Sequence, residues 1–146
     1  MIRTSVQAEA FDAAAELAAL GGDGDAGALV SFTGLVRGEP GSTLELQHYP
    51  GMTERQLDAI AGEAAERFAV LRGRVIHRYG LLHPGDAIVF VAVASPHRGD
   101  AFDAARFLMD WLKTKAPFWK RETRPDGTAH WVEAQAADNE AAALWD

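Results

Sequence analysis

The sequence predicts a single α+β domain with a mixed, largely antiparallel sheet, packed helices and a small antiparallel hairpin subdomain. The length of 146 residues is that of one domain. Segments with strand character are mixed with helical segments, and short turns join several of them, which indicates the α+β class. The clearest hairpin signal is Pro125-Asp126-Gly127, which separates two short runs near the C-terminal end.

The first half of the chain is predicted to contain three strands and two helices. The strands cover residues 1–6, at a sheet edge, and then 28–36 and 43–49. An Ala-rich helix covers 8–20 and should turn four residues inward: Phe11, Ala14, Leu17 and Ala18. The second helix begins at a capping box formed by Thr53 and Gln56. Its inward stripe is Leu57, Ile60, Ala61, Ala64 and Phe68.

The second half is predicted to contain four more strands and one helix. Residues 74–81 and 86–95 form strands joined by His83-Pro84-Gly85, and the second is apolar almost throughout, as a central strand buried on both faces would be. A helix runs from Asp100 or Asp103 to about 115 and ends before Pro117. It should bury Ala101, Ala104, Ala105, Leu108 and Trp111 or Leu112. Residues 118–124 and 128–133 form the hairpin.

Composition excludes several classes of protein. Because the chain has no cysteine, it has no disulfide framework, thiolate zinc site or cysteine nucleophile of its own. The longest apolar run, Ala87 to Ala94, is too short for a membrane helix. Glu9, Asp12 and Glu16 interrupt what would be the apolar core of a signal peptide. A cytoplasmic location without membrane association is therefore expected.

The charge distribution predicts a small anionic ligand. The net charge of −7 argues against binding to nucleic acid. Residues 95–124 nevertheless hold seven basic and four acidic side chains, so a basic island lies within an acidic chain. All three lysines fall in this island, at 113, 115 and 120, where burial could lower the pKa of an ammonium group. Chance, together with the preference of a helix C-terminus for cations, explains the cluster equally well.

Three further motifs carry no function. Gly22-x-Gly24-x-x-Gly27 matches a dinucleotide-binding pattern, but it follows a helix and precedes a strand, so it is interpreted as a turn. The five histidines lack the spacing of a metal site, and His77 and His83 are interpreted as strand and turn residues with local hydrogen bonds. No nucleophile elbow of a serine hydrolase is present. We therefore expect no metal.

The residues around the basic island form the candidate site. His97 and Arg98 lie between the central strand and a helix N-terminus, a place where anions gather, although a solvated arginine and a loop histidine fit as well. Lys113 ends the same helix and could equally belong to a polar helical face. Strand alternation places Lys120 with Glu122 on one side and Arg121 with Trp119 on the other.

Taken together, these segments resemble the large, catalytic subunit of molybdopterin synthase, the MoaE family. The resemblance covers residues 28 to 133 in order. Its main pieces are Phe32-Thr33-Gly34-Leu35-Val36-Arg37, His48-Tyr49-Pro50-Gly51-Met52, His97-Arg98 and Leu112-Lys113-Thr114-Lys115-Ala116-Pro117-Phe118-Trp119-Lys120-Arg121-Glu122. The resemblance implies an α/β hammerhead-type fold and a sulfurtransferase. Such an enzyme converts cyclic pyranopterin monophosphate to molybdopterin.

The resemblance also implies partners and site residues. Sulfur would come from the C-terminal Gly-Gly thiocarboxylate of a small ubiquitin-like carrier, with no further cofactor, and a homodimer would form the core of a heterotetramer. Lys113 and Lys120 would be the catalytic pair. The substrate-binding residues would be Leu35, Val36, Arg37, His97, Arg98, Arg121 and Glu122, with His97 and Arg98 able to act across the dimer interface.

Two other functions remain open from the residues alone. One is a non-catalytic module that binds an anion, which would tolerate arginine at positions 113 and 120. The other is a hydrolase or lyase that acts on a phosphate ester without a sulfur donor and so works in isolation. Turnover with and without a thiocarboxylated partner separates all three.

Overall fold

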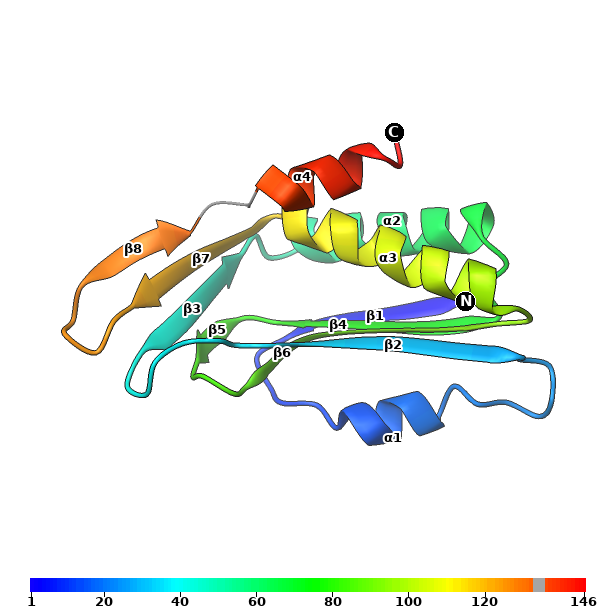
Figure 1. The fold of residues 1–146 in the computed structure, drawn as a ribbon, viewed down its shortest axis with the longest axis horizontal. Helices are drawn as coiled ribbons and strands as arrows, with labels where there is room; N and C mark the ends of the chain where they lie inside the picture. The colour runs from blue at the N-terminus through cyan, green and yellow to red at the C-terminus, as the bar shows by residue number, and fades with distance from the viewer. Residues whose placement is uncertain (133–135) are drawn as a thin grey trace.

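The computed structural model describes residues 1–132 and 136–146 and has the α+β architecture that the sequence predicts. Two four-stranded sheets have the strand orders β1-β4-β6-β2 and β5-β3-β7-β8. Helices α2 and α3 cover one face of the first sheet, α1 lies on the other face, and the second sheet extends from one end (Figure 1). Only the pair of β1 and β4 is parallel; the other strand pairs of the described residues are antiparallel.

The element bounds follow the predicted order closely. The strands of the first sheet are β1 (Ile2–Gln7), β2 (Ala28–Leu35), β4 (Arg72–Arg78) and β6 (Ala87–Ser95). Those of the second sheet are β3 (Thr43–His48), β5 (Gly80–Leu82), β7 (Phe118–Thr123) and β8 (Ala129–Val132). The helices are α1 (Ala13–Ala18), α2 (Met52–Arg67), α3 (Arg98–Thr114) and α4 (Ala136–Ala143). Residue 133 of the predicted hairpin lies outside the described residues.

The central strand β6 is buried on both faces, as predicted. Val89, Val91 and Val93 pack toward α2 and α3, where they meet Leu57 and Leu108. The alternate residues Phe90 and Ala92 pack on the other face, together with Ile76, Leu20, Phe11 and Leu17. The double burial explains why β6 lacks the polar alternation of a one-sided strand.

The predicted strand 74–81 is two strands that belong to different sheets. The chain leaves the first sheet after Arg78 and enters the second at Gly80, whose φ of +96° is in the region that favours glycine. Tyr79 lies between the two strands. The alternation of apolar and polar residues cannot reveal this change of sheet. Both strands turn one face toward the same protein interior, so the alternation gives no sign of the boundary between them.

Helix α1 is shorter than predicted, and its exposed face differs from the expected one. Asp12 caps the helix by accepting a hydrogen bond from the N–H of Ala15 at 3.1 Å. Phe11 and Leu17 pack on the sheet as expected, whereas Ala14 and Ala18 are exposed. A helix of six residues covers little more than one turn and a half, so it buries only a narrow stripe.

The predicted capping box at the start of α2 is wrong in its residues. The N-cap is Gly51, and the side chain of Glu54 accepts the N–H of Gly51 at 2.6 Å. Thr53 is buried and does not cap the helix, because its hydroxyl accepts the N–H of Tyr49 and donates to the carbonyl of Pro117. The entry to α2 is thereby tied to the segment that precedes β7.

The last helix was missed because its sequence is Ala-rich and acidic and has no apolar stripe. Trp145, which follows α4, packs edge-on against Phe68 and Phe107, with ring centroids 5.8 and 5.6 Å apart. The indole N–H of Trp145 donates to Asp110 at 2.7 Å. A single aromatic side chain beyond α4 thus anchors this end of the chain on α2 and α3, and no periodicity signals such an anchor.

Leu108 tests how much the layer between α3 and β6 contributes to stability. Its side chain is 0% exposed, so Leu108→Ala is expected to lower the free energy of unfolding by about 2–5 kcal/mol through lost burial and a residual cavity. The matched control is Leu144→Ala, because Leu144 is 82% exposed, and surface changes of this kind stay within about 0.5 kcal/mol. Urea denaturation of both variants makes the comparison; equal losses would contradict it.

Candidate functional site

Two lysines meet at the junction of the two sheets. Lys113 lies in the last turn of α3, and Lys120 lies on β7. Burial lowers the pKa of Lys120, and the charge of Lys113 lowers it further. Asp138 and Glu122 act in the opposite direction. Both effects favour the neutral amine more than in an exposed lysine, which suits Lys120 to take up and release a proton.

The direction of Lys120 follows from the alternation of β7. Phe118, two residues earlier on the same face, stacks on the ring of His77 in β4, with centroids 3.9 Å apart and planes at 18°. Lys120 therefore points toward the same interior. Trp119 and Arg121 are exposed on the opposite face of the strand. The predicted alternation is confirmed.

The uncharged imidazole ring of His77 borders the lysine site. Its side chain is 5% exposed. Burial lowers its pKa to about 3, with further contributions from the charges of Lys120 and Lys113. Its Nδ1 lies 2.9 Å from the carbonyl oxygen of Arg78 and must donate there, because a carbonyl only accepts. The predicted role of His77 as a strand residue with a local hydrogen bond is confirmed, but its place beside the lysines was not foreseen.

Arg37 and Glu122 line one cavity next to the lysine pair. This cavity of about 180 Å³ lies between the segment after β2 and the β7 end, and Arg124, Glu39, Ser42 and Thr43 also border it. Glu122 follows Lys120 by two residues on β7, so the cavity and the pair are about 7 Å apart along the strand. Glu122 also faces His130 of β8 at 3.3 Å. Two guanidinium groups at one cavity suit an anionic ligand.

The remaining predicted residues near Arg37 have unequal exposure. Leu35 is 62% exposed at the end of β2. Val36 is buried, and its backbone N–H donates to the carbonyl of Asp86 at 2.8 Å. Its carbonyl accepts the N–H of Gly85 at 2.8 Å. These bonds hold the backbone that leads into Arg37.

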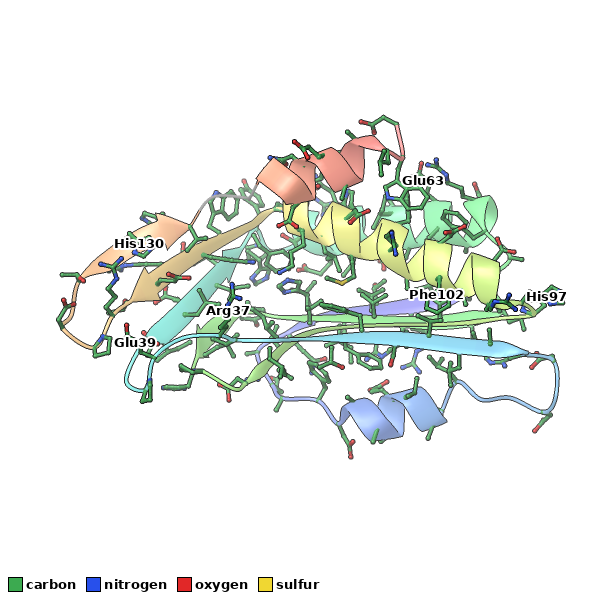
Figure 2. All side chains as sticks on the ribbon, viewed as in Figure 1. Arg37, Glu39, Glu63, His97, Phe102 and His130 are labelled. Atoms are coloured by element: carbon green, nitrogen blue, oxygen red, sulfur yellow. The ribbon has the colours of Figure 1, made fainter. Side chains whose placement is uncertain are left out.

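His97 and Arg98 lie far from the lysine pair of the same chain. They stand at the start of α3, and Lys113 stands in its last turn, about 22 Å away at 1.5 Å per residue. They border a separate shallow hollow with Gly27, Pro96 and Gly99. Figure 2 shows His97 at one end of the molecule and Arg37 far from it, near the second sheet. One chain therefore does not bring all the predicted site residues together.

Arg121 is also separated from the other site residues. It lies opposite Glu45 of β3 and Trp131 of β8 on the exposed face of the second sheet, whereas Lys120 faces the interior. Sequence reasoning missed Arg124, which borders the Arg37 cavity. The signal that could have found it is its position on the predicted hairpin, at the turn beyond Glu122.

Within residues 1–132 and 136–146, no group of three or more His, Asp or Glu side chains could hold a metal ion. No helix in those ranges is both long and apolar enough to cross a membrane. The charged groups at the site are Lys113 and Lys120 and, at the neighbouring cavity, Arg37, Arg124, Glu39 and Glu122.

The chain is similar to known proteins over almost its whole length. Residues 6–115 match the family model described as "MoaE protein". A protein from Mesorhizobium japonicum named molybdopterin synthase catalytic subunit is 54% identical over 144 residues, which cover 96% of this chain and 91% of that protein. One of the same name from Escherichia coli is 54% identical over 123 residues, covering 82% and 81%.

Solved structures share the fold. A MoaE protein from Burkholderia ambifaria superposes with a TM-score of 0.83 at 48% identity and covers 99% of this chain and 98% of its own. A molybdopterin synthase structure from Staphylococcus aureus has a TM-score of 0.78 at 31% identity, covering 88% and 95%. Both agree with the predicted fold class.

Fold and sequence together define an α+β protein in which two lysines, one on a helix and one on a strand, lie at the junction of two sheets. The family match covers most of the chain, and the relatives at about half identity span nearly all of it. The chain belongs to the MoaE protein family, as the resemblance in its sequence predicted.

The lowered pKa of Lys120 can be measured directly. We expect Lys120 to titrate below the ordinary value of 10.5, and Lys113→Met to raise its pKa, because that change removes the second cause of the shift. Burial, the first cause, remains in the variant, so the recovery should be partial. Acetylation rates of Lys120 across a pH series, read by mass spectrometry, make the test. An unchanged titration in Lys113→Met would contradict the coupling.

Proposed function

We propose that this chain is the catalytic subunit of a molybdopterin synthase. It would transfer sulfur from the C-terminal thiocarboxylate of a small ubiquitin-like carrier to cyclic pyranopterin monophosphate and so form the dithiolene of molybdopterin. Membership of the MoaE family and the name of its relatives support the role. The observation that carries it is the coupled pair of Lys113 and Lys120 beside an arginine-lined cavity. Because the chain has no cysteine, the sulfur has to arrive from outside.

The two lysines are proposed to have different roles: Lys120 transfers a proton, and Lys113 stabilises negative charge. Lys120, whose pKa burial and Lys113 lower, is suited to move a proton as the cyclic phosphate opens. Lys113 lies at the C-terminal end of α3, where the helix dipole favours a cation, and it is exposed. It is suited to stabilise negative charge that develops on the reacting oxygen.

The phosphate and the pterin would be held by Arg37 and Glu122 of one chain, with His97 and Arg98 of a second copy. Strand β2 is an edge strand, and Leu29, Phe32 and Leu35 on it are exposed. Ala28, at its start, pairs with Ser95, next to His97. A two-fold axis through the middle of β2 would therefore bring His97 and Arg98 of one copy beside Arg37 of the other. Arg121, on the opposite face, is the proposed site residue with the least support.

A carrier protein would dock on each outer end of such a dimer. The name "catalytic subunit" carried by the relatives implies a second kind of subunit. The carrier's tail ends in an anion, so its inner path should be basic, and Lys113 and Lys120 provide that charge. Light scattering that shows a strict monomer at micromolar concentration would contradict the dimer.

One experiment separates this function from its alternatives. Cyclic pyranopterin monophosphate is incubated with the purified chain, with and without a thiocarboxylated carrier, and dithiolene formation is measured. Product only with the carrier supports the sulfurtransferase. Consumption of the substrate without a carrier would indicate a hydrolase or lyase, and binding without conversion in either case would indicate an anion-binding module.

Lys115 provides an internal comparison for the lysine pair. It is exposed and faces Asp146 at 3.3 Å, so it is engaged away from Lys120. Exposed pairs of this kind contribute about 0–1 kcal/mol. Lys115→Ala should therefore change single-turnover conversion about twofold or less, whereas Lys113→Ala should lower it by about 10²-fold. Equal losses in the two variants would overturn this ranking.

A further inference from the structure

His48 lies near Lys120 and is adjacent to Glu54, and neither has a part in the function proposed above. β3 runs antiparallel to β7, so that His48 is opposite Phe118 and Leu46 is opposite Lys120. His48 and Lys120 are consequently diagonal neighbours on one face of the second sheet. Such neighbours are about 7–8 Å apart, within reach of long side chains.

One carboxylate oxygen of Glu54 lies next to the ring of His48. Oε2 accepts the N–H of Gly51 at 2.6 Å, which fixes the carboxylate at the start of α2. Oε1 is buried and, among the described residues, has no hydrogen-bond donor. It lies 3.5 Å from Nε2 of His48. A buried oxygen without a donor is costly, and catalytic hydrogen bonds are often long before substrate binds, so Nε2 is the donor that completes this carboxylate.

Of the two ring nitrogens of His48, Nε2 faces Glu54, and Nδ1 has no hydrogen-bond partner among the described residues. The ring packs against Tyr79, with centroids 4.2 Å apart, and its side chain is 12% exposed. The titratable groups around it are Glu54 on α2, Lys120 on β7, His77 on β4, Tyr79 after β4 and Lys113 at the end of α3. His77 is buried and donates its Nδ1 proton to a backbone carbonyl. Of these two histidines, His48 alone is paired with a carboxylate.

We propose that His48, oriented by Glu54, exchanges protons between Lys120 and solvent during turnover. The proposal rests on the proposed function, in which Lys120 moves a proton. The Lys120 ammonium loses an N–H bond, and the proton forms a new bond to Nδ1 of His48, while Nε2–H donates to Glu54. The imidazolium then releases the proton from Nδ1 to water. Every electron pair stays on its nitrogen, so the step needs no oxidant or co-reactant.

Removal of the imidazole should slow conversion in a way that added imidazole repairs. His48→Ala is expected to lower the single-turnover rate about 10²-fold, the lower end of the range for a group that moves a proton, with an unchanged KM for the pterin. Imidazole in the buffer should restore part of the rate. The matched control is His83→Ala, because His83 faces Asp86 at 3.8 Å in an exposed turn. That variant should keep the normal rate and show no response to imidazole.

Glu54→Gln separates the relay from a structural role. The amide oxygen can still accept the N–H of Gly51, so α2 keeps its cap, but the amide no longer requires the Nε2–H form of His48. We expect normal thermal unfolding with a rate at least about tenfold lower. A normal rate in His48→Ala or in Glu54→Gln, or a loss in His48→Ala that imidazole does not relieve, would overturn the proposal.

A measurement on the isolated chain distinguishes a failure of the His48 relay from a failure of the proposed function. Ring ¹⁵N chemical shifts should show Nε2 of His48 protonated in the unmodified chain and a change of tautomer in Glu54→Gln. An Nδ1–H form in the unmodified chain would overturn the proposal whatever the activity. The chemical shifts can be as expected while the unmodified chain forms no dithiolene with the thiocarboxylated carrier. In that case the proposed function is wrong, and the relay proposal, which depends on it, is wrong as well.

Discussion

Lys113→Arg and Lys120→Arg will each lose most dithiolene formation, although both keep the positive charge. Arginine is too basic to release a proton, and its planar guanidinium does not fit a site shaped for a compact ammonium. Lys120 carries a pKa lowered by burial and by Lys113, a property that arginine cannot reproduce. For Lys120 the loss should fall in the range of about 10²–10⁴-fold for a group that transfers protons. For Lys113, which stabilises charge, the misplaced guanidinium should cost about 10²-fold.

The measurement is single-turnover conversion of cyclic pyranopterin monophosphate with thiocarboxylated carrier in excess. Thermal unfolding and carrier binding should stay close to normal in both variants. Arg37→Ala is the comparison, because it borders the cavity and should mainly weaken substrate binding. Near-normal rates in both lysine variants would show that these residues supply only charge, and the site would then be an electrostatic clamp.

Two inactive variants will regain activity when they are combined in one dimer. Lys120→Ala removes the proton-moving group, and Arg98→Ala removes a group at the start of α3, about 22 Å along the helix from Lys113 of the same chain. If each site takes Lys120 from one copy and Arg98 from the other, a mixed dimer holds one site with both residues intact. Random mixing then restores about a quarter of the normal activity, because half of the dimers are mixed.

Co-expression of the two variants with different affinity tags isolates the mixed dimers. The control is a dimer of two Lys120→Ala chains that carry the two different tags. It should stay inactive at every ratio of the two chains. Absence of recovery in the mixed dimers would show that Arg98 and Lys120 do not share a site between copies. The proposed two-fold arrangement about β2 would then be wrong, whereas the role of the lysine pair would be unaffected.

The sequence by itself determined the class of fold, most element positions and the family. β6 is nine residues of nearly continuous apolar character, and Pro125-Asp126-Gly127 marks a hairpin. Both patterns involve only residues that are neighbours in the chain, so they can be recognised without knowledge of the fold. The alternation that turns Lys120 inward and Arg121 outward is local in the same sense. The order of the motifs was enough to predict membership of the MoaE family, which the comparisons confirm.

Only the tertiary structure decided which of these residues meet. The change of sheet at Tyr79 and the anchoring of the C-terminal end by Trp145 depend on contacts between segments distant in the chain. The same holds for His77, which stacks on Phe118 from a strand about 40 residues earlier, and for His48 beside Glu54. Periodicity reports the face on which a side chain lies, but the pKa of Lys120 depends on what the fold packs against that face.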